Sequence, residues 1–138
     1  QCIEIRWTRE RGESDIMETT REITKVEIIT RTSKLEELKE ALNNIGVLGM
    51  TVSQVYGCGL QKGHREIYRG QAYEINLVPK IKVETVICEI PVERVLEVAE
   101  KVLKTGKVGD GKIFVYKLSD AVRIRTGDRG PEAIMDEK

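Results

Sequence analysis

Several residue types that define common protein classes are scarce in this chain. Its three cysteines, Cys2, Cys58 and Cys88, lie far apart and form none of the close pairs that a zinc site or a redox-active CxxC motif needs. There is a single histidine, and aromatic residues make up only 4% of the 138 residues. The 23 basic and 23 acidic side chains cancel, so no net field draws the whole protein to nucleic acid or to an anionic membrane. We therefore expect reduced thiols, no nucleic-acid partner, and only local anion sites.

Long apolar runs are also missing. No stretch approaches the roughly 18 to 20 residues that a membrane span needs, and the N-terminal residues contain no apolar core of a signal peptide. We expect a cytoplasmic protein without membrane insertion. At 138 residues the chain is most simply one domain, and such a chain buries roughly two-thirds of the surface that its unfolded form exposes.

Hydrophobic patterns from residue 23 onward predict an alternation of strands and helices. β-Branched residues and period-two alternation predict strands at 23–30, 50–57, 80–88 and 112–118, and a short further strand from 121. The order βαββαβ, in two halves of similar length, predicts an α+β fold, a ferredoxin-like sandwich with helices on one face of an antiparallel sheet. Because two helices leave the other face of that sheet open, we expect oligomerisation to cover it.

Two helices are predicted between these strands. Ser33 followed by Glu36 is a capping-box signature, and apolar residues then recur at helical spacing up to Gly46. Pro91 opens the second helix. The stripe that we expect this helix to bury consists of Val95, Ala99, Val102 and Leu103.

The first 22 residues differ from the rest of the chain. They are dominated by charge and show no sustained period, so they predict a mobile extension outside the core. Trp7 could instead anchor this extension to a partner.

Two glycine-rich turns are candidates for binding a phosphate group. GCGLQKG occupies 57–63 and TGKVGDGK occupies 105–112, and glycine lets backbone N–H groups approach an anion. Neither is a Walker A sequence, and each alone is more typical of a plain turn. Arg123 and Arg125 share one face of the expected fifth strand, so they form either a site for a triphosphate or a solvated arginine stripe.

Strict alternation in 80–88 predicts one buried and one charged face. The buried set is Ile81, Val83, Thr85 and Ile87. Lys80, Lys82 and Glu84 share the other face, where they form either a small anion site or cross-strand ion pairs. His64 has no nucleophile or carboxylate fixed beside it, so we interpret it as a surface loop residue. We interpret Cys58 as a small loop residue rather than a reactive thiol.

Four segments taken in order, GCGLQKGHREIYRG, AYEINLVPKIKVE, TGKVGDGKIFVY and VRIRTGDRGPEAI, closely resemble the PII family of nitrogen-regulatory signal transducers. The resemblance implies a trimer of ferredoxin-like subunits that bind ATP or ADP in clefts between neighbours and sense 2-oxoglutarate. It also implies a long, mobile T-loop between the second and third strands, at 59–79. The chain then divides into an extension at 1–22, a PII signalling domain at 23–134 and a tail at 135–138.

The resemblance also implies the residues of each site. Glu84 would hold the adenine edge, Gln61 would coordinate magnesium beside the ATP phosphates, and Lys80 would pair with a carboxylate of 2-oxoglutarate. The implied 2-oxoglutarate site consists of Gln61, Lys62, Gly63 and Lys80. The implied nucleotide site consists of Thr51, Gly57, Cys58, Gly59, Leu60, Gln61, Lys62, Glu84, Val86, Gly109, Asp110, Gly111, Lys112, Arg123 and Arg125.

The chain departs from the family pattern in several places. Leu60 stands where many bacterial members have an arginine near the phosphates, which leaves the ranking of ATP and ADP open. RTSKL at 31–35 replaces a common turn that contains lysine and proline, and the extension at 1–22 has no counterpart in compact members. Tyr73 occupies the place of a tyrosine that some relatives uridylylate and many do not.

The resemblance implies a regulator whose targets are an ammonium transporter, enzymes of glutamine or arginine synthesis, or a nucleotidyltransferase. A slow nucleotide-hydrolysing enzyme on the same fold is the alternative. Attack by water would need a poised acid-base group, and Gln61 cannot abstract a proton. A structural trimer that binds metal ions would require a cluster of His or Cys that the sequence lacks.

Overall fold

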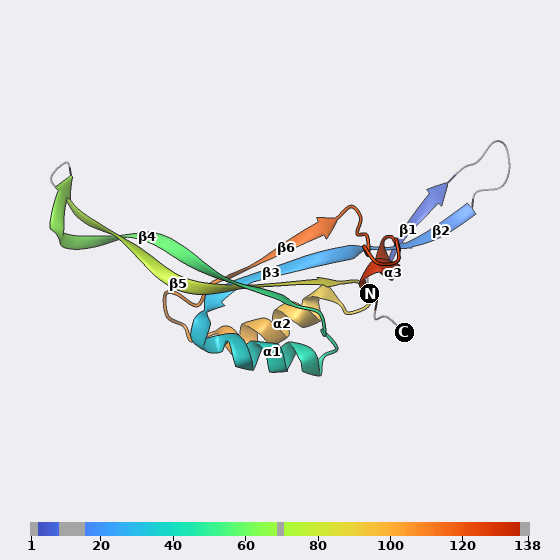
Figure 1. The fold of residues 1–138 in the computed structure, drawn as a ribbon, viewed down its shortest axis with the longest axis horizontal. Helices are drawn as coiled ribbons and strands as arrows, with labels where there is room; N and C mark the ends of the chain where they lie inside the picture. Colours follow the sequence, from blue (N-terminus) through green and yellow to red (C-terminus); the bar gives the residue numbers. More distant parts are fainter. Residues whose placement is uncertain (1–2, 9–15, 69–70, 136–138) are drawn as a thin grey trace.

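A four-stranded antiparallel sheet with two helices on one face forms the body of the protein (Figure 1). The computed structural model describes the backbone of residues 3–8, 16–68 and 71–135, and the side chains of residues 22–58 and 76–135. The strand order across the sheet is β4 (Thr51–Tyr68), β5 (Gln71–Ile87), β3 (Ile23–Arg31) and β6 (Lys112–Leu118). The helices are α1 (Leu35–Asn44) and α2 (Val92–Leu103). This topology confirms the predicted βαββαβ order and the ferredoxin-like α+β fold.

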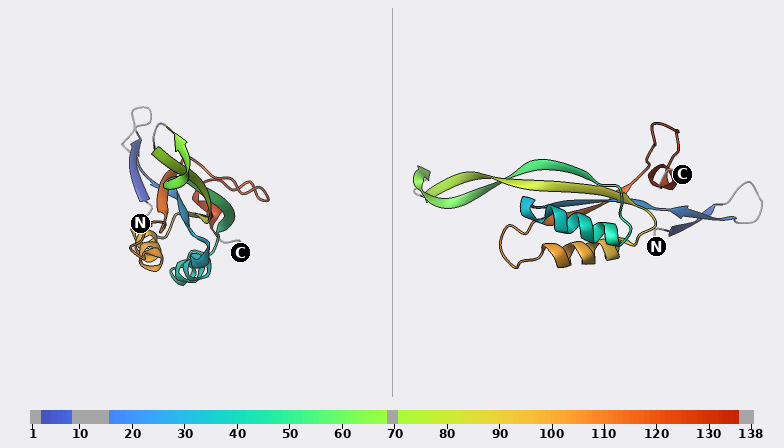
Figure 2. Two further views of the ribbon diagram at one scale, coloured as in Figure 1. Left: turned by 90° about the vertical axis from the view of Figure 1, so that its left-hand side faces the viewer. Right: turned by 60° about the horizontal axis from the view of Figure 1, so that its bottom comes forward.

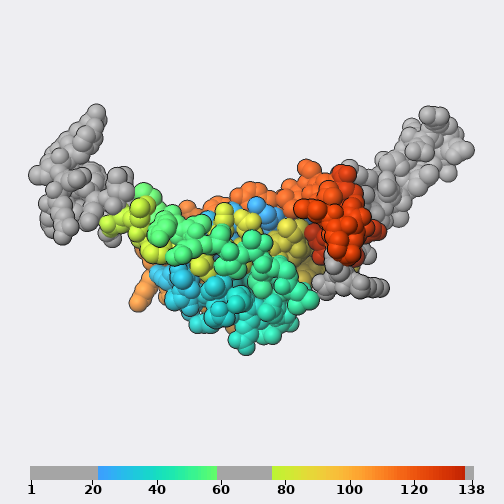
Figure 3. Space-filling view, in the orientation of Figure 1, coloured from blue at the N-terminus to red at the C-terminus, as the bar shows by residue number. Residues whose placement is uncertain are grey.

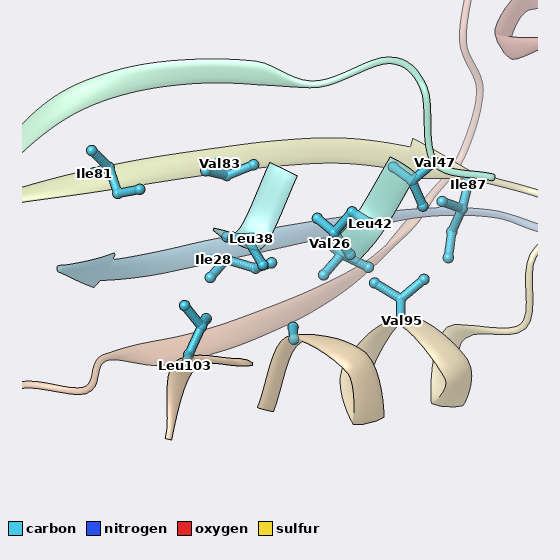
Figure 4. Close-up of a cluster of buried hydrophobic side chains, with 11 residues drawn as sticks. Val26, Ile28, Leu38, Leu42, Val47, Ile81, Val83, Ile87, Val95 and Leu103 are labelled. Carbon is cyan, nitrogen blue, oxygen red and sulfur yellow. The ribbon is translucent and has the colours of Figure 1, made fainter. Parts of the chain in front are cut away.

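The core lies between the sheet and the two helices (Figure 4). Alternation in β5 is as predicted, with Ile81, Val83, Thr85 and Ile87 at most 4% exposed. Leu38 and Leu42 of α1 and Val95 of α2 are 0% exposed and pack against this face. Ala99 and Leu103 complete the predicted stripe of α2, whereas Val102 is only partly buried at its edge.

The outer face of the sheet carries a lattice of opposite charges. Lys82 Nζ lies 3.5 Å from Oε1 of Glu84 and 3.7 Å from Oε1 of Glu27, and Lys25 Nζ lies 4.0 Å from Glu84. Within the predicted set of Lys80, Lys82 and Glu84, the last two are therefore members of cross-strand ion pairs. Phe114 and Tyr116 of β6 lie beside the lattice and are 41% and 44% exposed.

A second, smaller core closes one end of the outer face. Ile23 and Cys88 are buried there against Ala121, Ile134 and Met135 of the C-terminal segment, residues 119–135. This segment includes the short helix α3 (Pro131–Ile134), which lies on the side of the sheet opposite α1 and α2 (Figure 2). The C-terminal segment thus covers part of the face that two helices leave open.

Two predictions are wrong: the start of the first helix and the existence of a short fifth strand. A 3-10 turn, η1 (Thr32–Lys34), precedes α1 and moves the helix start past Ser33, so Lys34 is the N-cap and no side chain caps the helix. Glu36, expected in a capping box, instead pairs with Lys39 at 3.2 Å. The expected fifth strand from 121 is also absent from the described chain, where Val122 and Arg129 form only an isolated bridge.

Two segments expected to lack regular structure form paired strands. β1 (Ile3–Thr8) and β2 (Ile16–Arg21) make a separate antiparallel two-stranded sheet within the first 22 residues. Most of 59–79, expected as a loop, continues β4 and β5 as a long hairpin that extends beyond the helices (Figure 1). Ladder hydrogen bonds join backbone groups, so strand pairing does not require the apolar alternation that these segments lack.

Candidate nucleotide-binding site

The loop from Thr105 to Gly111, between α2 and β6, is held against the end of β3 and the middle of β5. The hydroxyl of Thr30 donates a 2.8 Å hydrogen bond to the carbonyl of Asp110. The ammonium group of Lys80 donates a 2.8 Å hydrogen bond to the carbonyl of Gly109. Gly109 and Gly111 both have φ of +104°, a conformation that favours glycine. The structure therefore brings the predicted second glycine-rich turn next to Lys80.

The carboxylate of Asp110 accepts hydrogen bonds that hold this loop in its conformation. Its carboxylate accepts hydrogen bonds from the backbone N–H of Thr105 at 2.8 Å and of Gly106 at 3.0 Å, from the Thr105 hydroxyl, and from the guanidinium of Arg31. The bonds from Thr105, with smaller contributions from Arg31 and Gly106, hold the pKa of Asp110 well below its usual range. Asp110 is thus a charged, fully engaged carboxylate at neutral pH.

Gly57, the first residue of the first glycine-rich turn, also lies beside Lys80. A Cβ built on Gly57 would lie 3.7 Å from Cγ of Lys80, so the backbone of β4 runs directly over the lysine stem. Gly57, Lys80 and Gly109 come from three different elements and converge within side-chain contact. This convergence joins parts of the two predicted sites, for nucleotide and for 2-oxoglutarate, into one.

Thr51, Glu84 and Val86 lie further along the sheet. Glu84 follows Lys80 by four residues, about 13 Å along a strand, and Thr51 is its register partner on β4. Val86 lines a hollow of about 440 Å³ together with Leu48 and Gly49. A hollow of that size with mostly apolar walls has room for a planar group, and the role of Val86 beside the base stays a prediction. The Glu84 carboxylate is paired with Lys25 and Lys82.

Arg123 and Arg125 lie in a turn and not, as predicted, on a strand. Gly127, with φ of +76°, lets the chain reverse there, and its N–H donates a 2.7 Å hydrogen bond to the carbonyl of Arg123. The guanidinium of Arg123 contacts Asp128 Oδ2 at 3.0 Å and donates to the carbonyl of Met135. Arg123 is therefore held within its own segment.

The segment between β6 and α3, which contains the two arginines, and the 105–111 loop lie at opposite ends of the sheet (Figures 1 and 2). The loop contacts Arg31 at the end of β3, and the C-terminal segment packs on Ile23 at its start. Nine residues of strand separate these ends, about 27 Å. In Figure 3 the C-terminal segment is the red patch at one end of the body, the orange atoms along the top belong to β6, and the loop is the small orange projection near the other end. One subunit alone does not bring these predicted site residues together.

Several predicted site residues have side chains outside the described part of the structure. They are Gly59, Leu60, Gln61, Lys62, Gly63 and Tyr73. The side chain of His64, which we interpret as a surface loop residue, also lies outside the described part. Of the cysteines, Cys58 is exposed and Cys88 is buried. Lys112 begins β6 beside Gly111 and is exposed.

Sequence reasoning missed Thr30, Arg31 and Thr105, which position the loop. Arg31 and Asp110 are 79 residues apart, and no periodicity within one element links them. The only local signal was the unusual turn at 31–35, whose first residue is Arg31.

Comparison with known proteins identifies the family. The family described as "Nitrogen regulatory protein P-II" matches residues 23–128. The chain belongs to the PII family. Nitrogen regulatory PII-like protein of Bacillus subtilis is 54% identical over 110 residues, which cover 80% of this chain and 95% of that protein.

Solved PII structures share the fold. The structure of the B. subtilis GlnK-ATP complex is 53% identical, with a TM-score of 0.72 over 81% of this chain and 97% of that one. Arabidopsis thaliana PII bound to citrate is 38% identical, with a TM-score of 0.65 over 81% and 92% of the two chains. These matches confirm the resemblance read from the glycine-rich and arginine-containing motifs.

Two negative findings apply to the described residues. No helix among them is long and apolar enough to span a bilayer. Within the same part of the chain, no three His, Cys, Asp or Glu side chains gather where they could hold a metal ion.

Proposed function

We propose that this PII-family protein is a trimeric regulator that binds ATP or ADP and 2-oxoglutarate and acts on target proteins through its β4–β5 hairpin. The observation that carries the proposal is the convergence of Gly57, Lys80 and Gly109 around a loop fixed by Asp110. A glycine-rich backbone beside a lysine suits a phosphate or carboxylate group. The ATP complex of a relative with 53% identity supports nucleotide as the ligand.

The separation of Arg123 and Arg125 from this loop supports a site shared between subunits. A phosphate group held at the loop is about one strand length from both arginines of the same chain. The corresponding arginines of a neighbouring subunit complete the site if subunits pack around a symmetry axis. The partly exposed outer face of the sheet, with Phe114 and Tyr116, is the surface that such packing would cover.

Lys80 is the proposed partner of a 2-oxoglutarate carboxylate. The citrate complex of the Arabidopsis relative shows that one PII protein accepts a polycarboxylate. Magnesium would be held by the ATP phosphates and the amide oxygen of Gln61, which are hard oxygen ligands of the kind that this ion prefers. The ion would supply a coordination position for the keto acid, so 2-oxoglutarate should bind only with Mg-ATP.

Nucleotide hydrolysis is the less favoured function. Asp110 is the carboxylate built into the loop, and its lowered pKa makes it a weak base. Its oxygens are already engaged by Thr105, Gly106 and Arg31. The relatives are named as regulatory proteins, which supports regulation over turnover, and we propose that this regulation takes place in the cytoplasm. An ammonium transporter, enzymes of glutamine or arginine synthesis and a nucleotidyltransferase are the proposed targets.

Titration calorimetry tests the proposal. Binding of 2-oxoglutarate is measured with Mg-ATP, with Mg-ADP and without nucleotide, and we expect measurable binding with Mg-ATP alone. Lys80→Met should weaken that binding roughly ten- to a hundred-fold, because a charge-assisted hydrogen bond contributes about 1.5 to 3 kcal/mol. Lys82→Met, which removes a lysine of the charge lattice on the same strand face, is the matched control. Equal binding under all three conditions would refute the metal-bridged site.

A further inference from the structure

Three consecutive carbonyl groups of the 105–111 loop accept hydrogen bonds from side chains of β3 and β5. Arg31 donates to the carbonyl of Val108 at 2.8 Å, Lys80 to that of Gly109 at 2.8 Å and Thr30 to that of Asp110 at 2.8 Å. The three donors come from two neighbouring strands, so the loop backbone is fixed along one side.

These bonds also determine where the amide groups of the loop point. In a planar trans peptide the N–H points opposite to the C=O of the same unit. The peptide units whose carbonyls are held contain the N–H groups of Gly109, Asp110 and Gly111. These N–H groups therefore point away from the side chains of β3 and β5. Successive backbone N–H groups displayed in this way form the concave kind of surface that binds anions.

Arg31 contributes more to this arrangement than either other donor. Besides the Val108 carbonyl, its guanidinium contacts the Asp110 carboxylate, which in turn closes the turn at Thr105 and Gly106. A Cβ on Gly109 would lie 3.0 Å from Nη2 of Arg31, so the guanidinium lies directly against the loop backbone. The Arg31 side chain is 29% exposed and is anchored at the end of β3.

We infer that Arg31 is a positioning residue of the nucleotide site, which holds the 105–111 loop through Asp110 so that its amide groups face a phosphate. This inference rests on the proposed function. In this role Arg31 acts through Asp110 and the loop and makes no contact with the phosphate itself. The effect of Arg31 on ATP affinity then depends on the presence of Asp110. This dependence distinguishes Arg31 from an arginine that binds phosphate directly.

A double-mutant cycle tests the inference on the full-length protein, with Arg31→Ala, Asp110→Asn and both changes together. ATP affinity is measured by calorimetry. Arg31→Ala should weaken ATP about ten-fold, which corresponds to about 1.4 kcal/mol. The double variant should lose little more than Asp110→Asn alone, because residues of one network are not additive. Arg31→Lys, which keeps the charge but not the two-pronged contact, should give intermediate affinity.

Hydrogen exchange provides a readout that does not depend on nucleotide. The amides of Thr105 and Gly106 donate to Asp110, so they should exchange faster in Arg31→Ala than in the wild type. Arg94→Ala, which removes an exposed arginine paired with Glu97 at 3.9 Å on α2, is the matched control and should change neither readout. Thermal melts of each variant identify any general loss of folding.

Each outcome has one meaning. Wild-type ATP affinity in Arg31→Ala, or effects of Arg31 and Asp110 that simply add, would overturn the positioning role and leave the proposed function intact. A wild-type protein that binds no nucleotide would refute the proposed function and the nucleotide role of Arg31. In that case faster exchange at Thr105 in Arg31→Ala would still establish that Arg31 holds the loop, and unchanged exchange would remove that part as well.

Discussion

The hydroxyl of Tyr116 on β6 donates a 3.2 Å hydrogen bond to Oε2 of Glu27 on the neighbouring strand β3. This bond, together with the negative charge of Glu27, raises the pKa of the Tyr116 phenol above its ordinary value. The ammonium group of Lys25 lies 4.8 Å from the centre of the same ring, a cation–π contact. Tyr116 thus links β6 to the charge lattice of the outer face.

The first prediction concerns alkaline pH. Because the folded-state pKa of Tyr116 is raised, its contribution to stability is present below the ordinary phenol pKa of about 10 and is lost as the pH rises through the folded value. Absorbance titration of phenolate formation should show a late component that Tyr116→Phe removes. Tyr56→Phe, which deletes a 63% exposed phenol on β4, should retain that component. Its survival in Tyr116→Phe would contradict the assignment.

The second prediction concerns the core. Leu38→Ala should lower the free energy of unfolding by about 2 to 5 kcal/mol, because the side chain is 0% exposed and its loss leaves a cavity between α1 and the sheet. Leu48→Ala removes the same atoms from a 63% exposed position and should cost about 0.5 kcal/mol or less. Urea unfolding of both variants measures the difference. Equal losses would show that Leu38 is not a core residue.

The third prediction separates steric from conformational effects in the glycine-rich loop. A Cβ on Gly111 would lie 1.9 Å from the carbonyl oxygen of Ile29, whereas one on Gly106 meets nothing within 4 Å. Both glycines have positive φ, which costs other residues roughly 1 to 2 kcal/mol. Gly106→Ala should therefore lower stability by about that amount, and Gly111→Ala by clearly more. Similar unfolding midpoints for the two variants would contradict the close approach of Gly111 to β3.

The fourth prediction concerns assembly. Light scattering should give about three times the mass of one chain, which is 15.6 kDa for the full chain. A chain that begins at Ile23 should likewise give about three times its own, smaller mass. The reason is that the outer face and the candidate site lie on the four-stranded sheet, whereas β1 and β2 form a separate sheet. A monomer at micromolar concentration would count against the shared site. A trimer only in the full chain would instead assign assembly to the β1–β2 hairpin.

The elements that the sequence predicts well are those in which one face is buried. Alternation in β5 and the apolar stripe of α2 are direct consequences of burial against the core, so the pattern of apolar residues predicts these two elements. The β1–β2 hairpin and the outer part of β4 were missed because strand pairing there leaves no such pattern. The capping box at Ser33 failed because a 3-10 turn moved the start of α1 by one residue.

The sequence predicts individual residues of the candidate site but not the hydrogen bonds that join them. The family resemblance and the glycine motifs point to Gly57, Lys80 and Gly109, and the structure brings these three together. The hydrogen bonds that fix the loop, from Thr30 and Arg31 to residues near 110, join positions about 80 residues apart in the chain. Such contacts depend on the tertiary arrangement of β3 and the loop, which local sequence patterns do not contain.

Strand β5 runs without interruption from the turn of the long hairpin, through Lys80, to Ile87 in the core. A slip of one residue against β3 would turn Ile81, Val83 and Ile87 out of the core and bring the charges of Lys82 and Glu84 into it. β5 therefore cannot slide along the strand direction without disrupting the core. A ligand at Lys80 can change the hairpin only by bending it, twisting it, or unzipping its ladder from the outer end.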